Sequence, residues 1–404
     1  MNPTQVNKGE RSLHVLMIAP TSFFSDYGGH IRILEETKAL QELGNRVTIV
    51  TYYKGSDMPG IDIRRTTPLP WHTDYEVGSS RHKIAFDLLL AGKSLREGLR
   101  IRPDIIHGHM HEGALIGGML ARLLRVPLVF DFQGSMTSEM VDHGFLNKDG
   151  RSYTLARRLE RTIDNALPRA ILTSSQQAAR LLEQDFQVDP RIIYPLPDCA
   201  DTERFYPAVI SDSEKKRLRR QLNIPEDRLI VAYLGLLTDY QGTPNLIEAA
   251  AYLKERDEAI HFLVMGYPNV DHYRRLASQA GVADTMTFTG KIQYRNAAHF
   301  LALGDIATAP KLSDTEGSGK ILNYMAMAQP VVAFDTPVSR EYLADWGVYA
   351  PLGDSTALAE ALRALAHDEG RRIETGRALR DRAKTRFSWR QAGEEIQDIY
   401  HLLT

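Results

Sequence analysis

Short apolar segments alternate with helix-like segments along this chain, and this alternation limits the possible folds more than any other feature. Segments typical of buried strands stand at 13–19, 46–52, 105–106, 126–130 and 170–173. The pattern starts again at 229–234, 260–265, 286–289, 306–309 and 331–334. Strands that alternate with helices form right-handed βαβ units in a parallel sheet. We therefore expect an α/β fold with two doubly wound, Rossmann-like domains that face each other across a cleft.

The length of the chain favours two domains over one. Its 404 residues exceed what a single hydrophobic core usually organises. A charged stretch at 211–227, which contains the basic run at 215–220, separates the two repeats of the pattern. Such a run usually belongs to a solvated helix, and contact with nucleic acid is the alternative. We expect the solvated helix and no nucleic-acid partner.

The composition excludes several classes of protein and site. A net charge of −2 gives no overall attraction to nucleic acid or to anionic membranes. Cys199 is the single cysteine, so an intramolecular disulfide and a cysteine-cluster metal site are both excluded. The polar N-terminal segment lacks the apolar core of a signal peptide, and no apolar run approaches the ~18 residues of a membrane span. We expect a cytoplasmic protein, whose basic segment at 151–161 forms either a solvated helix or a contact with a membrane surface.

The segment at 316–334, EGSGKILNYMAMAQPVVAF, combines a carboxylate, a flexible turn and a helix start. Gly317, Ser318 and Gly319 lead into an apolar, helix-forming run, which ends before a β-branched strand. The exposed N–H groups and the positive dipole end of such a helix favour the binding of a phosphate group. Glu316 could touch a sugar carried by that phosphate. Glycine-rich turns are also common connectors, so the pattern alone leaves both interpretations open.

This segment resembles the donor-site signature of the family-four retaining glycosyltransferases. In that family E-G-F-G, four residues, E-A-M-A and then P-V-V recur, and this chain has E-G-S-G, Y-M-A-M-A and P-V-V. The resemblance covers nearly the whole chain and implies the GT-B fold. It implies an acceptor-side domain at 1–205 and a donor domain at 206–386, with the helix at about 387–404 crossing back onto the first domain. The segment at 197–205 resembles the family's hinge, with Asp198-Cys199 in place of Asn-Gly, and we assign it no catalytic role.

The resemblance also implies a reaction. Enzymes of this kind move a sugar from a nucleotide-diphosphate sugar to a hydroxyl acceptor with retention at the anomeric carbon. The leaving phosphate oxygen takes the proton of the incoming hydroxyl, so we expect neither a metal nor another cofactor. The acceptor could be a glycan, a lipid or a small molecule, and the sequence identifies neither the sugar nor the base.

Two loops of the first half are candidates for ligand contact. Gly28 and Gly29 follow the first expected strand, and paired glycines let a backbone approach a ligand closely. The resemblance implies a position near the donor phosphates and the acceptor, whereas a simple tight turn is the alternative. Asp131, Gln133 and Gly134 lie at the end of another expected strand. They suit acceptor recognition, although an ordinary polar loop explains them equally well.

The histidines of His107-Gly108-His109-Met110-His111 could suggest zinc. We expect that three alternate histidines leaving a strand do not all point the same way, and no cysteine or H-E-x-x-H pattern supports a metal. The segment instead resembles the family's D-V-V-H-x-H, whose second histidine contacts the donor sugar. That role falls on His109, and His107 would be structural.

The second half departs from the family at its phosphate-binding turn. Members usually have G-R-L and then K-G, and their Arg and Lys hold the diphosphate. This chain has Leu236 and Gln241 at those positions, after Gly235. A leaving diphosphate needs its developing charge neutralised. We expect Lys320, at the helix start, to supply the missing cation, with Lys311 as the second candidate.

The acidic positions depart from the family as well. The second glutamate of the signature becomes Asn323, and Glu316 lies seven positions before it rather than eight. Asn323 can still form a hydrogen bond with a ribose hydroxyl, more weakly than a carboxylate would. Gly290 and Lys291 belong to a segment that resembles the family's V-x-F-x-G, whose backbone contacts the nucleobase.

We therefore expect a retaining hexosyltransferase with Glu316, His109 and Lys320 as its catalytic residues. The expected donor-binding residues are Gly28, Gly29, Gly235, Gln241, Gly290, Lys291, Gly317, Ser318, Gly319 and Asn323. One alternative is a non-catalytic or weakened relative that binds a nucleotide sugar, because the usual Arg and Lys are missing. Another is a nucleotide-sugar epimerase on the same fold, although the Y-M-A-M-A-Q-P-V-V segment argues against it.

Overall fold

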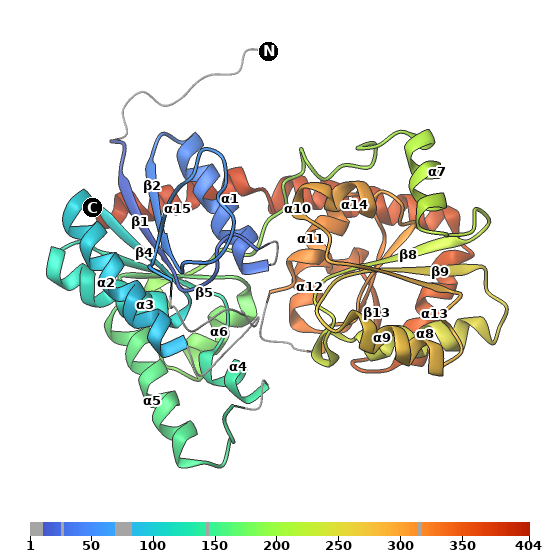
Figure 1. The fold of residues 1–404 in the computed structure, drawn as a ribbon, viewed down its shortest axis with the longest axis horizontal. Helices are drawn as coiled ribbons and strands as arrows, with labels where there is room; N and C mark the ends of the chain where they lie inside the picture. The colour runs from blue at the N-terminus through green and yellow to red at the C-terminus, as the bar shows by residue number, and fades with distance from the viewer. Residues whose placement is uncertain (1–10, 26–27, 69–82, 143–144, 313–316) are drawn as a thin grey trace. The chain divides into compact units, whose positions relative to one another are not determined.

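The computed structural model describes residues 11–25, 28–68, 83–142, 145–312 and 317–404. These residues form two compact units (Figure 1). Of the described residues, the first unit comprises those up to Pro197, Gly317 and Trp389–Thr404, and the second comprises 198–312 and Ser318–Ser388. Each unit is built around its own parallel sheet.

The first unit contains a seven-stranded parallel sheet in the order β3-β2-β1-β4-β5-β6-β7. Its strands are β1 (His14–Ala19), β2 (Arg46–Thr51), β3 (Asp62–Arg65), β4 (Ile105–His109), β5 (Leu128–Phe132), β6 (Ala170–Thr173) and β7 (Ile193–Pro195). Its helices are α1 (Gly28–Glu42), α2 (Lys83–Ile101), α3 (Met110–Leu124), α4 (Met136–Asp142), α5 (Arg151–Ala166), α6 (Gln176–Gln184), the 3₁₀ turn η1 (Pro190–Ile192) and α15 (Trp389–Leu403).

Helices cover both faces of the first sheet. Apolar side chains of α2 and α3 pack with β1, β2, β4 and β5 in one core cluster. Side chains of α3, α5 and α6 pack with β5 and β6 in a second cluster on the same face. On the other face α15 packs against α1, where Gly393 approaches Ala39 closely. Both faces of the central strands are therefore buried, which explains their nearly continuous apolar sequences.

The second unit contains a six-stranded parallel sheet in the order β10-β9-β8-β11-β12-β13. Its strands are β8 (Leu229–Leu234), β9 (Ile260–Met265), β10 (Met286–Gly290), β11 (Ile306–Ala309), β12 (Val331–Phe334) and β13 (Val348–Ala350). Its helices are α7 (Asp212–Gln221), η2 (Asp239–Gln241), α8 (Thr243–Lys254), α9 (Val270–Gln279), α10 (Tyr294–Leu301), α11 (Gly319–Ala326), α12 (Pro337–Leu343), η3 (Ala344–Trp346), α13 (Ser355–Ala366) and α14 (Glu369–Arg386).

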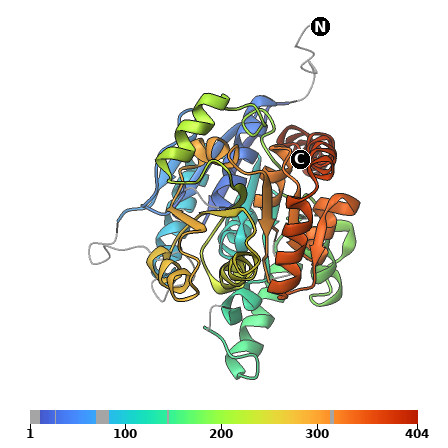
Figure 2. The ribbon, with the colours of Figure 1, turned by 90° about the vertical axis from the view of Figure 1, so that its right-hand side faces the viewer.

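The second sheet also carries helices on both faces (Figures 1 and 2). Helices α8, α9 and α13 pack with the strands in one large core cluster. Helices α11 and α14 pack against each other on the opposite face. The charged stretch at 211–227 contains α7, whose basic side chains are exposed or half-buried; this is the solvated helix that the sequence predicts.

The two doubly wound sheets confirm the predicted α/β class, and ten strands lie where the sequence places them, with small shifts at their ends. Three strands were not predicted: β3, β7 and β13. Each is three or four residues long, stands at an edge of its sheet and is mostly half-buried. Edge strands need no continuous apolar run because only part of their surface is covered, so the apolar pattern does not reveal them. No helix within the described ranges is both long and apolar enough to cross a membrane.

Candidate active site

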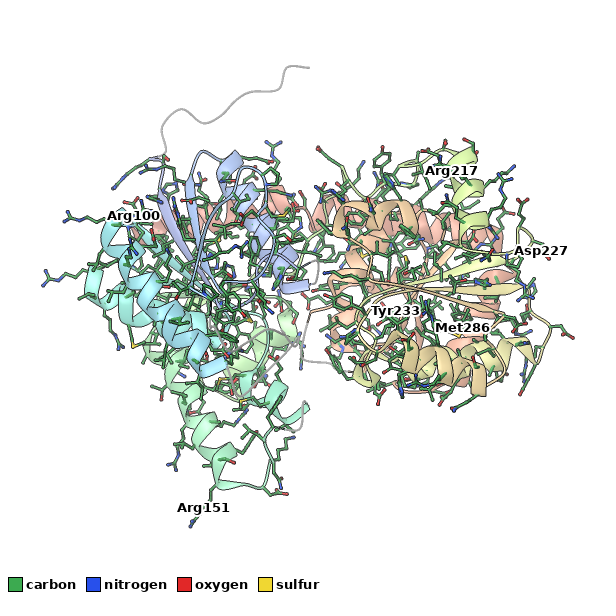
Figure 3. The ribbon with its side chains drawn as sticks, in the orientation of Figure 1. Arg100, Arg151, Arg217, Asp227, Tyr233 and Met286 are labelled. Carbon is green, nitrogen blue, oxygen red and sulfur yellow. The ribbon has the colours of Figure 1, made fainter. Side chains whose placement is uncertain are left out.

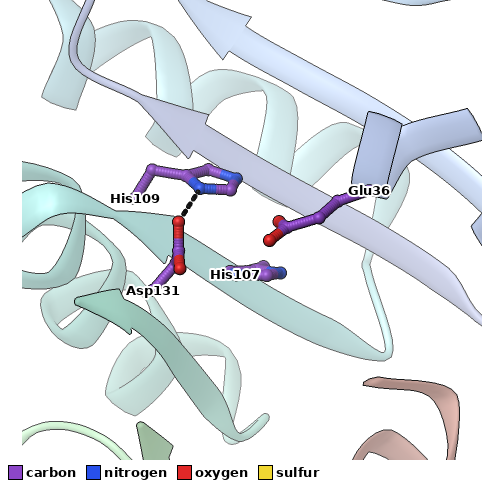
Figure 4. A group of neighbouring side chains, drawn as sticks. All are labelled: Glu36, His107, His109 and Asp131. Carbon is purple, nitrogen blue, oxygen red and sulfur yellow. Dashed lines mark hydrogen bonds and ion pairs between the residues drawn. The ribbon is translucent and has the colours of Figure 1, made fainter. Parts of the chain in front are cut away.

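His109 and Asp131 are neighbours on two adjacent strands of the first sheet. His109 is the last residue of β4, Asp131 lies on β5, and the register of this parallel pair places them side by side. His109 Nδ1 lies 2.9 Å from Asp131 Oδ2, and both side chains are fully buried (Figure 4). The expected sugar-contacting histidine and an expected acceptor residue therefore form one hydrogen-bonded pair.

Charged neighbours hold Asp131 in its ionised form. From α1, the Nε and Nη2 atoms of Arg32 both lie 2.9 Å from Asp131 Oδ1, and Gln133 Nε2 donates to Oδ2 at 2.8 Å. Burial by itself raises the pKa of this carboxyl, but Arg32 and His109 outweigh that effect and hold it well below its usual range. Arg32 also pairs with Glu36, at 3.0 Å between Nε and Oε1. The negative charge of the Asp131 carboxylate thus lies directly beside the positive charge of the Arg32 guanidinium.

This arrangement fixes the role of each ring nitrogen of His109. An ionised carboxylate only accepts hydrogen bonds, so Nδ1 of His109 donates to Asp131. The other nitrogen, Nε2, is buried and has no hydrogen-bond partner among the described residues. A buried polar atom without a partner is costly unless a ligand satisfies it. His109 Nε2 is therefore positioned to exchange a hydrogen bond with a ligand hydroxyl.

The three histidines do not all point the same way, as the sequence predicts, but two of them share one face of the sheet. The rings of His107 and His109 stack, with centroids 4.5 Å apart and planes at 18°. Both lie on β4, where residues two apart share one face of the sheet. His111 lies on α3 and contacts a different group of side chains. His107 Nδ1 lies 2.7 Å from the hydroxyl of Tyr400, and burial, followed by the charge of His109, lowers its pKa well below the usual value.

Within the described ranges, two groups of buried side chains have the ligand types of a metal site. They are Glu36, His107, His109 and Asp131 in the first group, and His111, Glu160 and Asp164 in the second. In the first group Arg32 already supplies positive charge, and both oxygens of Asp131 accept hydrogen bonds from protein donors. This chemistry is that of an ion-pair network, so we derive no metal-dependent step from it.

The glycine pair meets Gln133. Gly28 and Gly29 are the first residues of α1, and Gln133 and Gly134 directly follow β5. A Cβ atom added to Gly29 would lie 2.8 Å from Gln133 Oε1. The missing Cβ leaves room for this amide in its present position, from which it reaches Asp131. The structure thus joins Gly29, Gln133, Asp131 and His109 into one cluster at the carboxyl end of the sheet.

Gly235, Gln241 and Lys320 come together beyond the carboxyl ends of β8 and β11 in the second sheet. Lys320 is the second residue of α11, and its Nζ donates to Gln241 Oε1 at 2.7 Å and to the hydroxyl of Tyr233 at 3.3 Å. The same ammonium lies 4.5 Å from the centre of the Tyr233 ring. A Cβ at Gly235 would stand 2.6 Å from Lys320 Nζ. The glycine therefore opens the space that the ammonium group occupies.

Lys320 provides a cation next to the position where family members usually have a phosphate-binding lysine. Gln241 holds that position, and the Lys320 ammonium lies one hydrogen bond away from its amide. Burial lowers the pKa of Lys320 to about 7, and the charge of Lys311 adds to the effect. A bound anion would offset both influences. The assignment of Lys320 to a phosphate contact stays a prediction.

The glycine turn before α11 is described only in part. Glu316, the expected catalytic acid, lies outside the described residues. Ser318 is the N-cap residue of α11, and its buried hydroxyl has no partner among the described residues. A Cβ at Gly319 would lie 3.5 Å from Asp198 Oδ2, so an acid of the hinge segment stands at this helix start. Asn323 follows Gly319 by four residues on α11 and is half-buried, as is Gly317.

The expected nucleobase segment lies two strands away from β8. Gly290 ends β10, at a register shift between β10 and β9, and has a φ of +76°. Lys291 is exposed, and its ammonium lies 5.1 Å from the ring centre of Tyr267. Both residues stand at the carboxyl edge of the second sheet, as Gly235 does.

Two family models match the sequence, and they agree on the type of protein. The family model described as Glycosyltransferase Family 4 matches residues 28–204, and the one described as Glycosyl transferases group 1 matches residues 214–386. The chain belongs to the family-four-like glycosyltransferases. Both halves of this glycosyltransferase are covered, which confirms the resemblance drawn from its motifs.

Individual relatives support the same conclusion. The glycosyltransferase is 28% identical over 315 residues to a D-inositol 3-phosphate glycosyltransferase of Corynebacterium aurimucosum, covering 74% of this chain and 71% of the relative. HepE of Anabaena, solved with UDP and glucose, has a TM-score of 0.79 at 15% identity over 97% of this chain and 100% of its own. Sucrose-phosphate synthase of Thermosynechococcus elongatus has a TM-score of 0.81 at 18% identity, covering 97% and 99%. These two structures confirm the GT-B fold.

Three residues that hold the two clusters together lie outside the motifs of the sequence: Arg32, Glu36 and Tyr233. Arg32 pairs with both Asp131 and Glu36 from α1, and the hydroxyl of Tyr233 on β8 accepts a hydrogen bond from Lys320. Arg32 and Glu36 are at most 2% exposed although they are charged. A charged i, i+4 pair within an otherwise apolar helix face is the signal that could have found them.

Proposed function

We propose that this glycosyltransferase moves a hexosyl group from a nucleotide-diphosphate sugar to a hydroxyl acceptor, with retention and without a metal ion. The observation that carries the proposal is the convergence of Lys320, Gln241 and Gly235 at the carboxyl edge of the second sheet. Ligands of doubly wound sheets bind at this edge. The structure of HepE from Anabaena, which shares the fold, contains UDP and glucose.

The diphosphate would be held by Lys320 and by the N-terminus of α11. The first backbone N–H groups of a helix and its dipole favour an anion, and an ammonium group adds a full positive charge. Gly317 and Gly319 have no side chain to block an approach to that backbone, and Gly290 and Lys291 would contribute to the binding of the base. Lys320 would thereby neutralise the charge that develops on the leaving diphosphate.

The sugar would be positioned by His109 and Glu316. His109 Nε2 is the buried atom without a partner, and the hydrogen bond from Nδ1 to Asp131 keeps the ring in a fixed orientation. The proton of the incoming hydroxyl would pass to the leaving phosphate oxygen, so no side chain needs to act as a general base. Asp131, Gln133 and Gly134 would lie on the acceptor side.

The proposal is tested by ligand-induced stabilisation followed by turnover. UDP, GDP, ADP and their common sugar conjugates are screened by thermal shift with the wild type, with Lys320→Ala and with Lys384→Ala, an exposed lysine of α14 as matched control. A ligand at a hundred times its dissociation constant stabilises the native state by about 2.7 kcal/mol. We expect a shift with one base that Lys320→Ala loses and Lys384→Ala keeps.

Turnover separates an enzyme from a binding protein. The donor identified in the screen is incubated with the wild type and with Glu316→Gln, and the release of nucleoside diphosphate is measured, with water as the minimal acceptor. We expect slow release by the wild type and a loss of at least about a hundredfold in the variant. Binding without release of diphosphate would instead identify a non-catalytic relative, and no binding of any nucleotide would refute the proposal.

A further inference from the structure

Large apolar side chains gather on the outer surface of three helices of the first unit. Fourteen such side chains are exposed in the described part of the chain, and eight of them lie on α2, α3 and α5. We call these eight the apolar face: Ile84, Leu88, Leu95, Leu99, Met119, Leu123, Leu155 and Leu159. Single exposed apolar residues need no explanation, whereas a concentration on neighbouring elements indicates an interaction surface.

The spacing of these residues forms stripes along each helix. On α2 the four residues follow one another at intervals of four, seven and four, which keeps them on one side of the helix. Met119 and Leu123 of α3 are four residues apart, as are Leu155 and Leu159 of α5. The opposite sides of these helices already pack on the sheet, for example through Phe86 of α2. The outer stripes are therefore additional to what the fold needs.

The three helices lie side by side. Gly98 of α2 meets α3 so closely that an added Cβ would lie 2.9 Å from Leu120. On its other side α3 meets the end of α5, where an added Cβ at Gly118 would lie 2.9 Å from Leu167 and Arg122 donates to the backbone oxygen of Ala166 (Figure 1). The stripes thus belong to one layer that covers one face of the first sheet.

Charges on these helices are sorted by sign. Their five acids are buried or half-buried and have partners within the unit: Asp87, Glu97, Glu112, Glu160 and Asp164. Their exposed charges are all arginines: Arg96, Arg100, Arg122, Arg151, Arg158 and Arg161. Arg100 and Arg151 are labelled in Figure 3, where both extend outward from the unit. A chain with a net charge of −2 therefore presents one layer whose exposed charges are all positive.

We infer that the apolar face and its arginines bind the surface of an anionic lipid membrane. Apolar side chains rimmed by basic ones match the boundary between acyl chains and negatively charged headgroups. A second copy of this chain is a poorer occupant, because a symmetric contact would place these arginines against each other. The inference requires no glycosyl transfer, so it can hold or fail independently of the proposed function.

Vesicle flotation of the full-length protein tests this inference. The partition coefficient is measured with phosphatidylcholine vesicles that contain either no or about 30% phosphatidylglycerol, at low and at high salt. Each basic residue at an anionic surface multiplies partitioning by about fivefold, so the double variant Arg96→Glu/Arg158→Glu should bind at least about 25-fold more weakly. Leu95→Gln/Leu99→Gln should also lower binding. Because all four positions are exposed, we expect the variants to melt at the wild-type temperature.

Matched controls come from the second unit. Lys216→Glu/Arg217→Glu reverses two exposed charges on α7, and Leu352→Gln/Ile373→Gln replaces two side chains of similar exposure. These variants should bind vesicles as the wild type does. The inference is overturned if the wild type does not float with anionic vesicles at low salt, or if the controls lose as much binding. Concentration-dependent dimers that disappear in Leu95→Gln/Leu99→Gln would overturn it in favour of self-association.

Discussion

At the scale of single residues, burial and charge decide what each polar group can do. Asp131 is fully buried yet ionised, because the guanidinium of Arg32 and the ring of His109 compensate its charge. Lys320 has the opposite balance, since Tyr233 and Gln241 offer its ammonium no negative charge and Lys311 opposes it. A charge that is compensated within the protein orients its neighbours, whereas one that is not compensated is available for a ligand.

The lowered pKa of Lys320 predicts how donor binding depends on pH. In the proposed function the protonated amine binds the diphosphate, and in the free protein it loses its proton as the pH rises through about 7. The dissociation constant of the donor should therefore be lowest below pH 7 and should rise above it, by at most tenfold per pH unit. Titration calorimetry between pH 6 and 9 measures this dependence. Lys320→Arg stays charged and should give a flat profile; the same slope in that variant would assign the titration to another group.

At the scale of elements, both candidate clusters depend on glycines where strands turn into helices. Gly29 makes room for Gln133 at the start of α1, and Gly235 makes room for Lys320 after β8. In both places a polar side chain from another element fills the space that a Cβ would take. The ends of the strands thus position the backbone of these turns. Because the glycines have no Cβ, the side chains of Gln133 and Lys320 can approach that backbone closely.

Gly235→Ala should uncouple the turn after β8 from Lys320. The new Cβ would lie 2.6 Å from Lys320 Nζ, which is the flexible end of a side chain and can move away. We expect a donor affinity about tenfold lower, or ~1.4 kcal/mol, with little change in the melting temperature. Gly92→Ala on α2 is the matched control, because its Cβ would meet nothing within 4 Å. A large loss of stability with unchanged affinity would show that Gly235 serves only the fold.

At the scale of the whole molecule, the first unit is completed by the end of the chain. Helix α15 packs on α1, Gln397 accepts a hydrogen bond from Asn45, and the hydroxyl of Tyr400 contacts His107 on β4. Ile396 and Tyr400 are fully buried in this contact. The hydrogen-bonding environment of the histidine pair therefore includes a residue 293 positions away from His107.

A chain that ends at Ser388 should lose stability in its first unit alone. Burial of side chains the size of Ile396 and Tyr400 contributes roughly 1.5–3 kcal/mol each, so the free energy of opening should fall by more than about 3 kcal/mol. Hydrogen exchange should then increase in α1 and β4 and stay unchanged in β8 and β9. Removal of only Leu403 and Thr404 is the control. Equal loss of protection in both sheets would contradict two separate cores.

The sequence by itself determined the class of fold and the family. The central strands could be predicted because both their faces are buried, which favours nearly continuous apolar runs whatever their neighbours are. The glycine motifs and P-V-V segment could be recognised because backbone at a phosphate-binding edge tolerates few residue types. His109, Asp131, Gln133 and Lys320 were all named from the sequence, since each lies in or beside such a motif.

Only the tertiary structure decided how those residues are connected. Arg32 reaches Asp131 across 99 positions, and Lys320 reaches Gln241 across 79. The sorting of acids inward and arginines outward on α2, α3 and α5 likewise depends on which side of each helix meets the sheet. Local sequence specifies which segments form strands and helices, because propensity and periodicity act over a few residues. The pairing of charges and the sharing of one surface by several helices follow from packing between segments distant in the chain, which no local pattern encodes.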